Sequence, residues 1–595
     1  MNSLFGNWAS TLRKSLLSLA LAILLPIFGF SNSVMAAERI YASYSPLKLT
    51  LSVSILENYA KTGAINDELR KYQQYLQAPQ LQELRQVLLQ PVKVSPAVVS
   101  QFLYTAQGEF LLRRLAKLIK TPSRQAESKL QTLRSALILA TAEPGGLTLL
   151  NLLRKYPTNS IHIDLVHSLG IAGELEKLIS ETSRAIALVT KQSNIEAATI
   201  PAANLSSLPD LQTEGQFKLQ KYPLRFFDLT RNRLLLTDVY VPNVHSPAPV
   251  IVISHGLGLD SSNFRYLATH LASHGFAVVV PNHPGSDAKQ LQSLLNGSAG
   301  EVAAPDEFKD RPRDVKYILD QLEKSNQADS RFQGRLNLQQ VGVFGQSFGG
   351  YTALALAGAK INFEQLREDC QPDSLQDTWN MSLLLQCRAL ELSVDQSGKE
   401  YDLGDERVKA AIAVNPMTSS IFGKLGLSQI KTPVLLVGSS EDTVAPALSE
   451  QILPFSWFAN AHKYLLILIG ATHFSTIGNS NPGSEQVALP AEMVGDASLA
   501  RRYMKVLSLP FFQTYVAGKS QYTSYLNAAY AKSISSKSLG LSLVQSLSTK
   551  ELAAVMGDNI NGTNTVKPKS PDTIVRFGFW ILDIGLSLLQ GTIFL

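Results

Sequence analysis

One short segment near the middle of the chain limits the fold more than any other feature. The run VGVFGQSFGGYTALALAG places a G-x-S-x-G motif, Gly345–Gly349, between a strand-like and a helix-like stretch. The flanking glycines of such a motif leave room for a sharp strand-to-helix turn that exposes the serine hydroxyl. The serine also stands at a helix N-terminus, where the helix dipole favours developing negative charge. The motif therefore predicts Ser347 as a nucleophile.

The surrounding sequence indicates a parallel sheet. Short runs rich in Val, Ile and Leu alternate with helix-like segments: PVIVISHG, FAVVVPNHPG, VGVFGQS, VKAAIAVNP, PVLLVGSS and KYLLILIG. Strands that are apolar on both faces and separated by helices form a parallel sheet covered on both sides. Together with the nucleophile turn, this pattern predicts an α/β-hydrolase fold over residues 216–556.

A nucleophilic serine needs a general base, and the base needs an acid that orients it. In this fold they follow the serine in the order Asp, then His, on loops after later strands. Asp442 follows PVLLVGSS and His473 follows KYLLILIG, which predicts a triad of Ser347, Asp442 and His473. Glu441 is the competing acid, whereas His462 precedes its strand and is expected at the wrong edge of the sheet.

The oxyanion formed on the substrate needs two preorganised donors. The residue after the nucleophile supplies one backbone N–H, here that of Phe348, and the loop after an early strand supplies the other. That loop is His255-Gly256-Leu257-Gly258, so Leu257 is predicted as the second donor. His255 could be read as a second base, but a residue in this place more often orients the loop. The predicted chemistry requires no metal and no organic cofactor.

The run SHGLGLDSSNFRYLATHLASHGFAVVVPNHPGSD, then RPRDVKYILDQL and GQSFGG, resembles the platelet-activating-factor acetylhydrolases, which cleave short acyl groups from phospholipids. The resemblance implies Leu257 and Phe348 as oxyanion donors and Ser347 and His473 as nucleophile and base. The acid departs from that family, whose aspartate follows the strand where this chain has VNPMTSS with Asn415. The segments GSSEDTVAP and GATHFS are closer to bacterial cutinases, polyester hydrolases and dienelactone-hydrolase-like enzymes.

Most of the remaining chain precedes the hydrolase region. The arrangement, with AERIYASYSPLKLTLSVSILENYAKTG near its start, resembles cyanobacterial hydrolases that carry an N-terminal domain of unknown function. Apolar residues recur there at three- and four-residue spacing, which predicts a small all-helical domain over residues 37–197. The small and polar residues 198–215, with two prolines, predict a linker.

Both ends of the chain carry apolar segments. Arg13 and Lys14 precede the apolar run Leu16 to Phe30 and then SNSVMAAE, which predicts a signal peptide over residues 1–36. An uncleaved anchor is the alternative, although Pro26 interrupts the run. Cleavage implies export to the periplasm or the extracellular space. The tail, residues 557–595, ends in an apolar stretch that predicts a packed segment or contact with a lipid surface.

An insertion over residues 360–406 is longer than a plain connection and lies where lids form in these hydrolases. It contains the only two cysteines, Cys370 and Cys387, which are expected to pair if the chain is exported. Buried free thiols are the alternative. Trp379 and Met381 are among the apolar residues that could contact an acyl chain.

A formal net charge of +6 over 595 residues is too small to indicate a nucleic-acid partner. The sequence predicts a serine hydrolase of carboxylic esters, acting on lipid or short-chain acyl esters. It leaves open peripheral membrane contact and the oligomeric state. A cutinase-like polyesterase is one alternative. A non-catalytic cell-envelope binding protein with a vestigial hydrolase domain is another, which failure to react with a serine-directed phosphonate would support.

Overall fold

The computed structural model describes most of the chain. The described residues are 37–44, 47–72, 78–91, 96, 99–100, 103–104, 106–120, 126–201, 208–376, 378–393, 401–479 and 494–557. The predicted signal peptide and residues 558–595 of the predicted tail lie outside them. Within these ranges, no helix is both long enough and apolar enough to cross a bilayer.

The chain divides into two compact units. The smaller comprises the described residues up to Pro91 together with Ala116–His167, and the larger comprises Val92–Leu115 and the residues from Ser168 onward. The boundary between these units differs from the predicted one, a linker over residues 198–215. Most of the long helix α9 (Leu165–Ala198) belongs to the larger unit, because Ala185 and Val189 are fully buried in its core.

The prediction of an all-helical N-terminal domain is wrong. The smaller unit contains a four-stranded sheet in the order β2-β1-β4-β3. Its strands are β1 (Arg39–Tyr44), β2 (Leu47–Ser52), β3 (Ile119–Lys120) and β4 (Ser160–Asp164), and its helices are α2 (Val53–Thr62), α3 (Asp67–Arg70), α4 (Ala78–Leu89), α7 (Ala126–Thr141) and α8 (Leu149–Lys155). The strands are short, and β1 pairs in parallel with β4 from a distant part of the chain. The helical periodicity of the intervening residues therefore dominates the local pattern.

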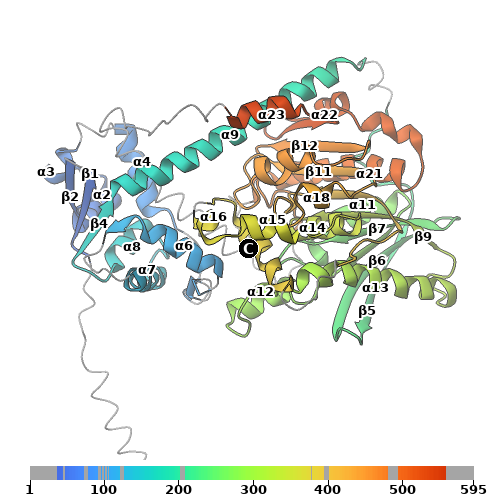
Figure 1. Cartoon of the computed structure of the whole chain (residues 1–595), viewed down its shortest axis with the longest axis horizontal. Helices are drawn as coiled ribbons and strands as arrows, with labels where there is room; N and C mark the ends of the chain where they lie inside the picture. The colour runs from blue at the N-terminus through green and yellow to red at the C-terminus, as the bar shows by residue number, and fades with distance from the viewer. Residues whose placement is uncertain are drawn as a thin grey trace, which may run out of the picture. The chain divides into compact units, whose positions relative to one another are not determined.

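The larger unit contains a nine-stranded sheet in the order β13-β12-β11-β10-β9-β7-β8-β6-β5 (Figure 1). Neighbours from β12 to β8 are parallel, while β13, β6 and β5 pair antiparallel at the two sides. The strands are β5 (Leu219–Asp228), β6 (Arg233–Pro242), β7 (Ala248–Ser254), β8 (Ala277–Pro281), β9 (Leu336–Gln346), β10 (Val408–Val414), β11 (Val434–Ser439), β12 (Lys463–Ile469) and β13 (Gly540–Val544).

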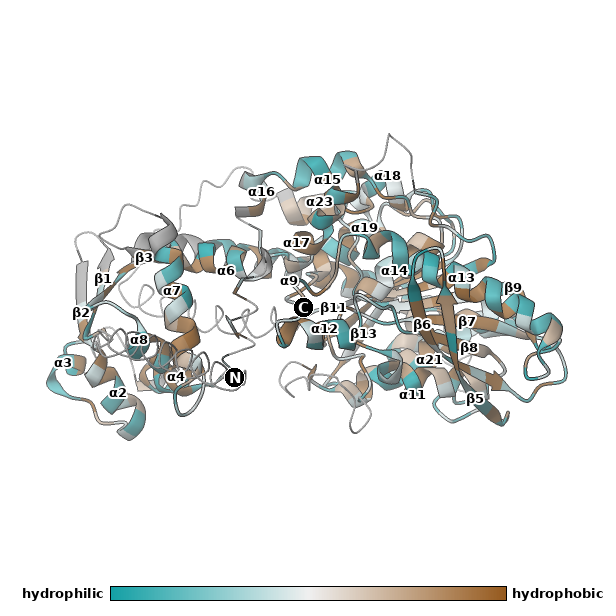
Figure 2. Cartoon of the chain, turned by 90° about the horizontal axis from the view of Figure 1, so that it is seen from below, coloured by the Kyte–Doolittle hydropathy of each residue, from teal (hydrophilic) through white to brown (hydrophobic). Residues whose placement is uncertain are grey.

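Helices cover both faces of this sheet, and two cores result. Val250 and Val252 of β7 contribute to one core with α13 and α14, whereas Ile251 and Ile253 contribute to the other with α11 and α21. Figure 2 shows the apolar strands β7 and β8 in brown and the largely hydrophilic α13 in teal. The helices of the larger unit are α6 (Ala106–Ala116, except its last residue), α9, α11 (Arg265–Ser273), α12 (Ala288–Leu295), α13 (Glu307–Ala328), α14 (Phe348–Leu356), α15 (Phe363–Asp369), α16 (Pro372–Gln376), α17 (Met381–Arg388), α18 (Gly423–Leu427), α19 (Leu453–Phe455), α21 (Ala497–Tyr515), α22 (Ala528–Ile534) and α23 (Thr549–Gly557).

Acid should destabilise the larger unit through a buried histidine of α11. His270 is fully buried, and neither ring nitrogen has a hydrogen-bond partner among the described residues. Burial, with the neighbouring His274 and Lys505, lowers the pKa of His270 from 6.5 to about 3. Between these pH values the unfolded chain binds a proton that the folded chain does not. Stability therefore falls as the pH decreases through this window, by about 1.4 kcal/mol for each pH unit.

We expect His270→Leu to remove this part of the acid sensitivity. At neutral pH the variant should be at least as stable as the wild type, because two unsatisfied buried polar atoms are lost. At about pH 5 its advantage should reach about 2 kcal/mol, measured by urea unfolding across the pH range. His462→Gln, at an exposed histidine, is the control and should not change the slope. An unchanged slope in His270→Leu would show that the pKa of His270 does not differ between the folded and the unfolded chain.

Candidate active site

Ser347 lies on a strained turn between β9 and α14. Its φ angle is +56°, in the left-handed region that non-glycine residues seldom adopt. The two motif glycines make the turn possible. A Cβ on Gly345 would lie 1.8 Å from the Gly349 carbonyl oxygen, and one on Gly349 would lie 2.0 Å from the Ser254 carbonyl oxygen. The close approach of Ser254 also places the loop after β7 directly beside the serine turn.

The structure brings Ser347, His473 and Asp442 into one hydrogen-bonded chain. His473 Nε2 lies 2.9 Å from Ser347 Oγ, and His473 Nδ1 lies 2.6 Å from Asp442 Oδ2. All three residues are buried, with 2–7% of their surface exposed. They meet because β9, β11 and β12 run in parallel, so the loops that follow these strands emerge at the same edge of the sheet.

The acid loop distinguishes Asp442 from its neighbour. Asp442 Oδ1 accepts hydrogen bonds from the backbone N–H groups of Val444 (2.8 Å) and Ala445 (2.7 Å), which leaves Oδ2 for the imidazole. Glu441 is exposed, and among the described residues it is not the carboxylate that contacts His473. His462 lies just before β12, at the opposite end of that strand from His473.

One candidate oxyanion donor directly follows Ser347, and the other lies on the loop after β7, which approaches the serine turn at Ser254 and His255. Phe348 is the first residue of α14, and Leu257 follows the end of β7 by three residues. Within the described part of the chain, neither backbone N–H donates a hydrogen bond to another protein group. Both are thus available to an incoming oxygen. This free pair, beside a serine with a histidine partner, can stabilise a tetrahedral oxyanion.

His255 orients this loop rather than serving as a second base. Its Nδ1 lies 2.7 Å from the Gly256 carbonyl oxygen, and its Nε2 accepts the backbone N–H of His283 at 3.0 Å. These contacts place the single proton of the neutral ring on Nδ1. Burial and the nearby charge of Arg311 lower the pKa of His255 well below its usual range. A neutral ring with both nitrogens engaged cannot accept a proton from the serine.

Two side-chain amides near His473 were not identified from the sequence as site residues. Gln346 Nε2 donates to the His473 carbonyl oxygen at 3.1 Å, and Asn415 Nδ2 donates to the same oxygen at 3.3 Å. Asn415 has a φ angle of +45° and also donates to Ser439 Oγ. In the sequence, Gln346 is only a variable position of the motif, and Asn415 is only the position where the acid would follow from the resemblance to platelet-activating-factor acetylhydrolases.

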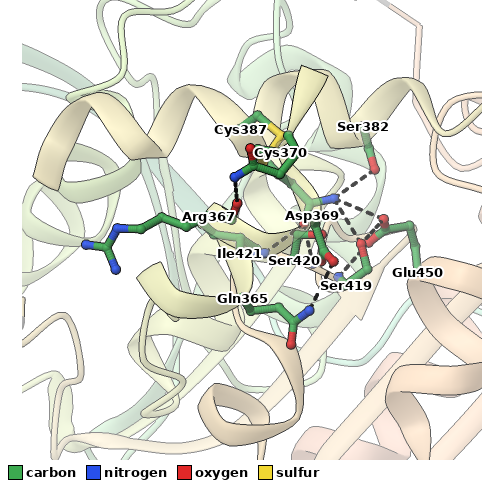
Figure 3. Close-up of a disulfide and its surroundings, with 12 residues drawn as sticks. Gln365, Arg367, Asp369, Cys370, Ser382, Cys387, Ser419, Ser420, Ile421 and Glu450 are labelled. Atoms are coloured by element: carbon green, nitrogen blue, oxygen red, sulfur yellow. Dashed lines mark hydrogen bonds between the residues drawn. A yellow bond between two sulfur atoms is a disulfide. The ribbon is translucent and has the colours of Figure 1, made fainter. Parts of the chain in front are cut away.

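The predicted disulfide between Cys370 and Cys387 is present, with the two Cα atoms 5.6 Å apart. It joins the end of α15 to α17 within the insertion (Figure 3). Residues 377 and 394–400 of the insertion lie outside the described ranges. The backbone N–H of Ser382, at the start of α17, donates to the Val444 carbonyl oxygen at 2.8 Å. The insertion is therefore attached to the loop that carries Asp442.

A buried carboxylate fastens the same insertion to the sheet edge. Glu450 is fully buried and accepts hydrogen bonds from the backbone N–H groups of Thr418 (2.6 Å) and Ser419 (2.9 Å) after β10. Its other oxygen accepts the side-chain amides of Asn380 and Gln386 from the insertion. Figure 3 shows Glu450 and its hydrogen-bonded neighbours in the surroundings of the disulfide. The disulfide and Glu450 together hold α17 in one place.

The comparisons with known proteins agree with this architecture. Residues 36–164 match the family described as alpha/beta hydrolase of unknown function (DUF1400), and residues 249–362 match alpha/beta hydrolase fold. The second match and the nine-stranded sheet confirm the predicted α/β-hydrolase fold.

Three relatives are cutinases of Thermobifida species. The chain is 23% identical over 296 residues to Cutinase 2 of Thermobifida cellulosilytica and to Cutinase cut1 of Thermobifida fusca. These alignments cover 48% of this chain, 76% of the first relative and 62% of the second, so the chain spans about three fifths of the length of Cutinase cut1. It is 24% identical over 306 residues to Cutinase est1 of Thermobifida alba, covering 49% of this chain and 78% of that protein.

Proposed function

We propose that the larger unit is a serine hydrolase that cleaves carboxylic esters through an acyl-enzyme. The observation that carries the proposal is the hydrogen-bonded chain from Asp442 through His473 to Ser347, at the sharp turn after β9. The match to the α/β-hydrolase fold and the similarity to cutinases support an ester hydrolase in general. The geometry of the individual residues supports the role that the proposal gives to each.

In the first half of the reaction, Ser347 Oγ attacks the ester carbonyl carbon and its proton passes to His473 Nε2. The carbonyl oxygen becomes an oxyanion and accepts the N–H groups of Leu257 and Phe348. Asp442 holds the Nδ1–H of the imidazole, which keeps Nε2 free to accept the proton. His473 then donates this proton to the leaving alcohol as the C–O bond breaks, and the acyl group remains on the serine.

In the second half, His473 Nε2 removes a proton from water, and the hydroxide attacks the acyl-enzyme carbonyl carbon. The resulting oxyanion occupies the same pair of donors. As it collapses, the bond to Ser347 breaks, the proton returns from His473 to the serine oxygen, and the carboxylic acid leaves. No electron transfer occurs in either half.

Apolar side chains beside the triad favour an acyl substrate. Val444 and Ala445 of the acid loop pack with Phe474, next to the candidate base, and with Ile477. Lipid or short-chain acyl esters suit these apolar surroundings, and the sequence resembles the platelet-activating-factor acetylhydrolases, which cleave short acyl groups from phospholipids. A cutinase-like polyesterase is the second candidate, because the three relatives described above are cutinases. The disulfide supports an exported protein, since such bonds persist in oxidising compartments such as the periplasm or the cell exterior.

Purified full-length protein tests the proposal directly. A fluorophosphonate should label Ser347, as located by peptide mapping. A series of soluble esters from acetyl to decanoyl should also be hydrolysed, and the fluorophosphonate should count the same number of active sites whichever ester is used. Greater activity on an insoluble polyester film than on the soluble esters would favour the polyesterase. Neither labelling nor turnover would contradict a hydrolase and favour a binding protein with an inactive fold.

The disulfide should govern substrate choice. Cys370→Ser combined with Cys387→Ser frees the helix that Ser382 and Glu450 hold beside the acid loop. Long acyl chains depend on such a wall for remote binding energy, so kcat/KM for decanoyl esters should fall about tenfold. Acetyl esters should be nearly unaffected. An equal fall across the whole series would instead show that the bridge supports the Asp442 loop.

A further inference from the structure

A single buried guanidinium contacts the oxyanion loop and the aromatic ring of the other oxyanion donor. Arg311 of α13 is fully buried. Its Nη1 donates to the His255 carbonyl oxygen at 2.7 Å, and its Nη2 donates to the carbonyl oxygens of Gly256 and Ser286, both at 3.4 Å. Its Nε donates to Ser286 Oγ at 2.9 Å. The guanidinium carbon also lies 4.4 Å from the centre of the Phe348 ring.

These contacts fix the direction of the Leu257 N–H. The Gly256 carbonyl and the Leu257 N–H belong to the same peptide group, and in a trans peptide they point in opposite directions. Arg311 and His255 Nδ1 both hold the carbonyl oxygen on the buried side. The N–H therefore points away from the guanidinium. The ring of Phe348, whose N–H is the other candidate donor, rests on the same guanidinium.

The charge of Arg311 indicates a role other than stabilising the fold. Burial lowers the pKa of the guanidinium to about 10, although Glu307 and Asp314 act in the opposite direction. The group therefore remains a cation at neutral pH. Its Nε lies 4.0 Å from a Glu307 carboxylate oxygen, which in turn accepts the hydroxyl of Ser286. An apolar side chain of similar volume would fill this space without the desolvation cost of a buried ion.

We propose that Arg311 is a positioning residue for the oxyanion site. It holds the loop so that the Leu257 N–H faces the reacting carbonyl, and it supports Phe348 so that the Phe348 N–H faces the same carbonyl. The inference rests on the serine hydrolase function proposed above. It assigns the buried cation a role in the rate of the chemical steps rather than in substrate binding.

Kinetics normalised to active sites test the assignment. Arg311→Lys keeps the charge and loses the planar fork, and Arg311→Gln loses both. For each variant, kcat per site titrated with a fluorophosphonate should fall about 100-fold, with KM nearly unchanged, as for loss of an oxyanion donor. The Ki of a trifluoromethyl ketone, which forms a tetrahedral oxyanion on the serine, should rise by the same factor as kcat/KM falls. A purely structural role would lower the titre and Tm and leave kcat per site unchanged.

Arg233 offers a matched control. It is a largely buried arginine of the same ionic cluster, bonded to Asp314 and Glu307, and among the described contacts it does not bond to the oxyanion loop. Arg233→Lys should lower Tm but keep kcat per site within about threefold of the wild type. If the Arg311 variants do not fold, Ser286→Ala removes one anchor of the guanidinium and should lower kcat about tenfold with the same rise in Ki.

Two outcomes would overturn the inference. One is an unchanged kcat per titrated site in Arg311→Lys, or in Ser286→Ala if the Arg311 variants do not fold. The other is a fall in kcat without a matching rise in the Ki of the ketone. If the wild type itself neither turns over esters nor reacts with the fluorophosphonate, the proposed function fails instead.

Discussion

Ser347→Ala should lower kcat/KM for every ester by about 10⁴-fold or more, because the members of a triad act as a unit. The fold should be retained. The described structure gives the Ser347 hydroxyl a single side-chain hydrogen bond, to His473, and alanine adopts the same backbone turn as serine. The free energy of unfolding should change by less than about 1 kcal/mol. Steady-state rates on soluble esters and a urea unfolding curve measure the two effects.

Ser440→Ala is the matched control for this variant. Ser440 lies at the same edge of the sheet, where its hydroxyl accepts the backbone N–H of Gly470 at 2.8 Å. This control should keep its activity and its reaction with a fluorophosphonate. Substantial turnover by Ser347→Ala, in preparations free of contaminating esterases, would remove Ser347 from the role of nucleophile.

The main parts of the candidate site could be predicted because each follows its own apolar strand. Ser347, Asp442 and His473 come after β9, β11 and β12, and a parallel sheet brings the carboxyl ends of its strands to one edge. The local pattern of each strand is therefore enough to place the loop behind it.

The residues that position this site could not be found in the same way. Gln346 and Asn415 act on a carbonyl group of the distant residue His473, and Arg311 acts on the loop after β7. Their roles depend on which loops meet in space. A sequence pattern identifies a side chain's own element but not the backbone group it contacts.

The sheet of the smaller unit could not be predicted for a related reason. Arg39 pairs with Ser160 and Ile119 with Ile163, so its sheet is assembled from segments that lie far apart in the chain. No single one of these segments is long enough to outweigh the helices between them. Short strands that pair at long range cannot be recognised from local periodicity.

Asp442→Asn should lower kcat by about 10⁴-fold through the tautomer of His473. The Oδ1 atom of Asp442 accepts the N–H groups of Val444 and Ala445, so an amide at this position keeps its carbonyl oxygen there. The amide NH₂ must then face His473 Nδ1 and donate to it. The ring proton moves to Nε2, which can no longer accept the serine proton. Rates of ester turnover and of fluorophosphonate labelling should fall together, since both need that acceptor.

Two neighbouring variants separate the acid from its surroundings. Glu441→Gln changes an exposed side chain next to Asp442 and should leave the rate unchanged. Asn415→Ala removes one of two amides on the His473 carbonyl and should cost about tenfold, the equivalent of one hydrogen bond. Because His473 has only one Nδ1–H to donate, a single carboxylate can set its tautomer. A severe loss in Glu441→Gln with a mild loss in Asp442→Asn would place the acid one residue earlier, on a loop rearranged from the one described.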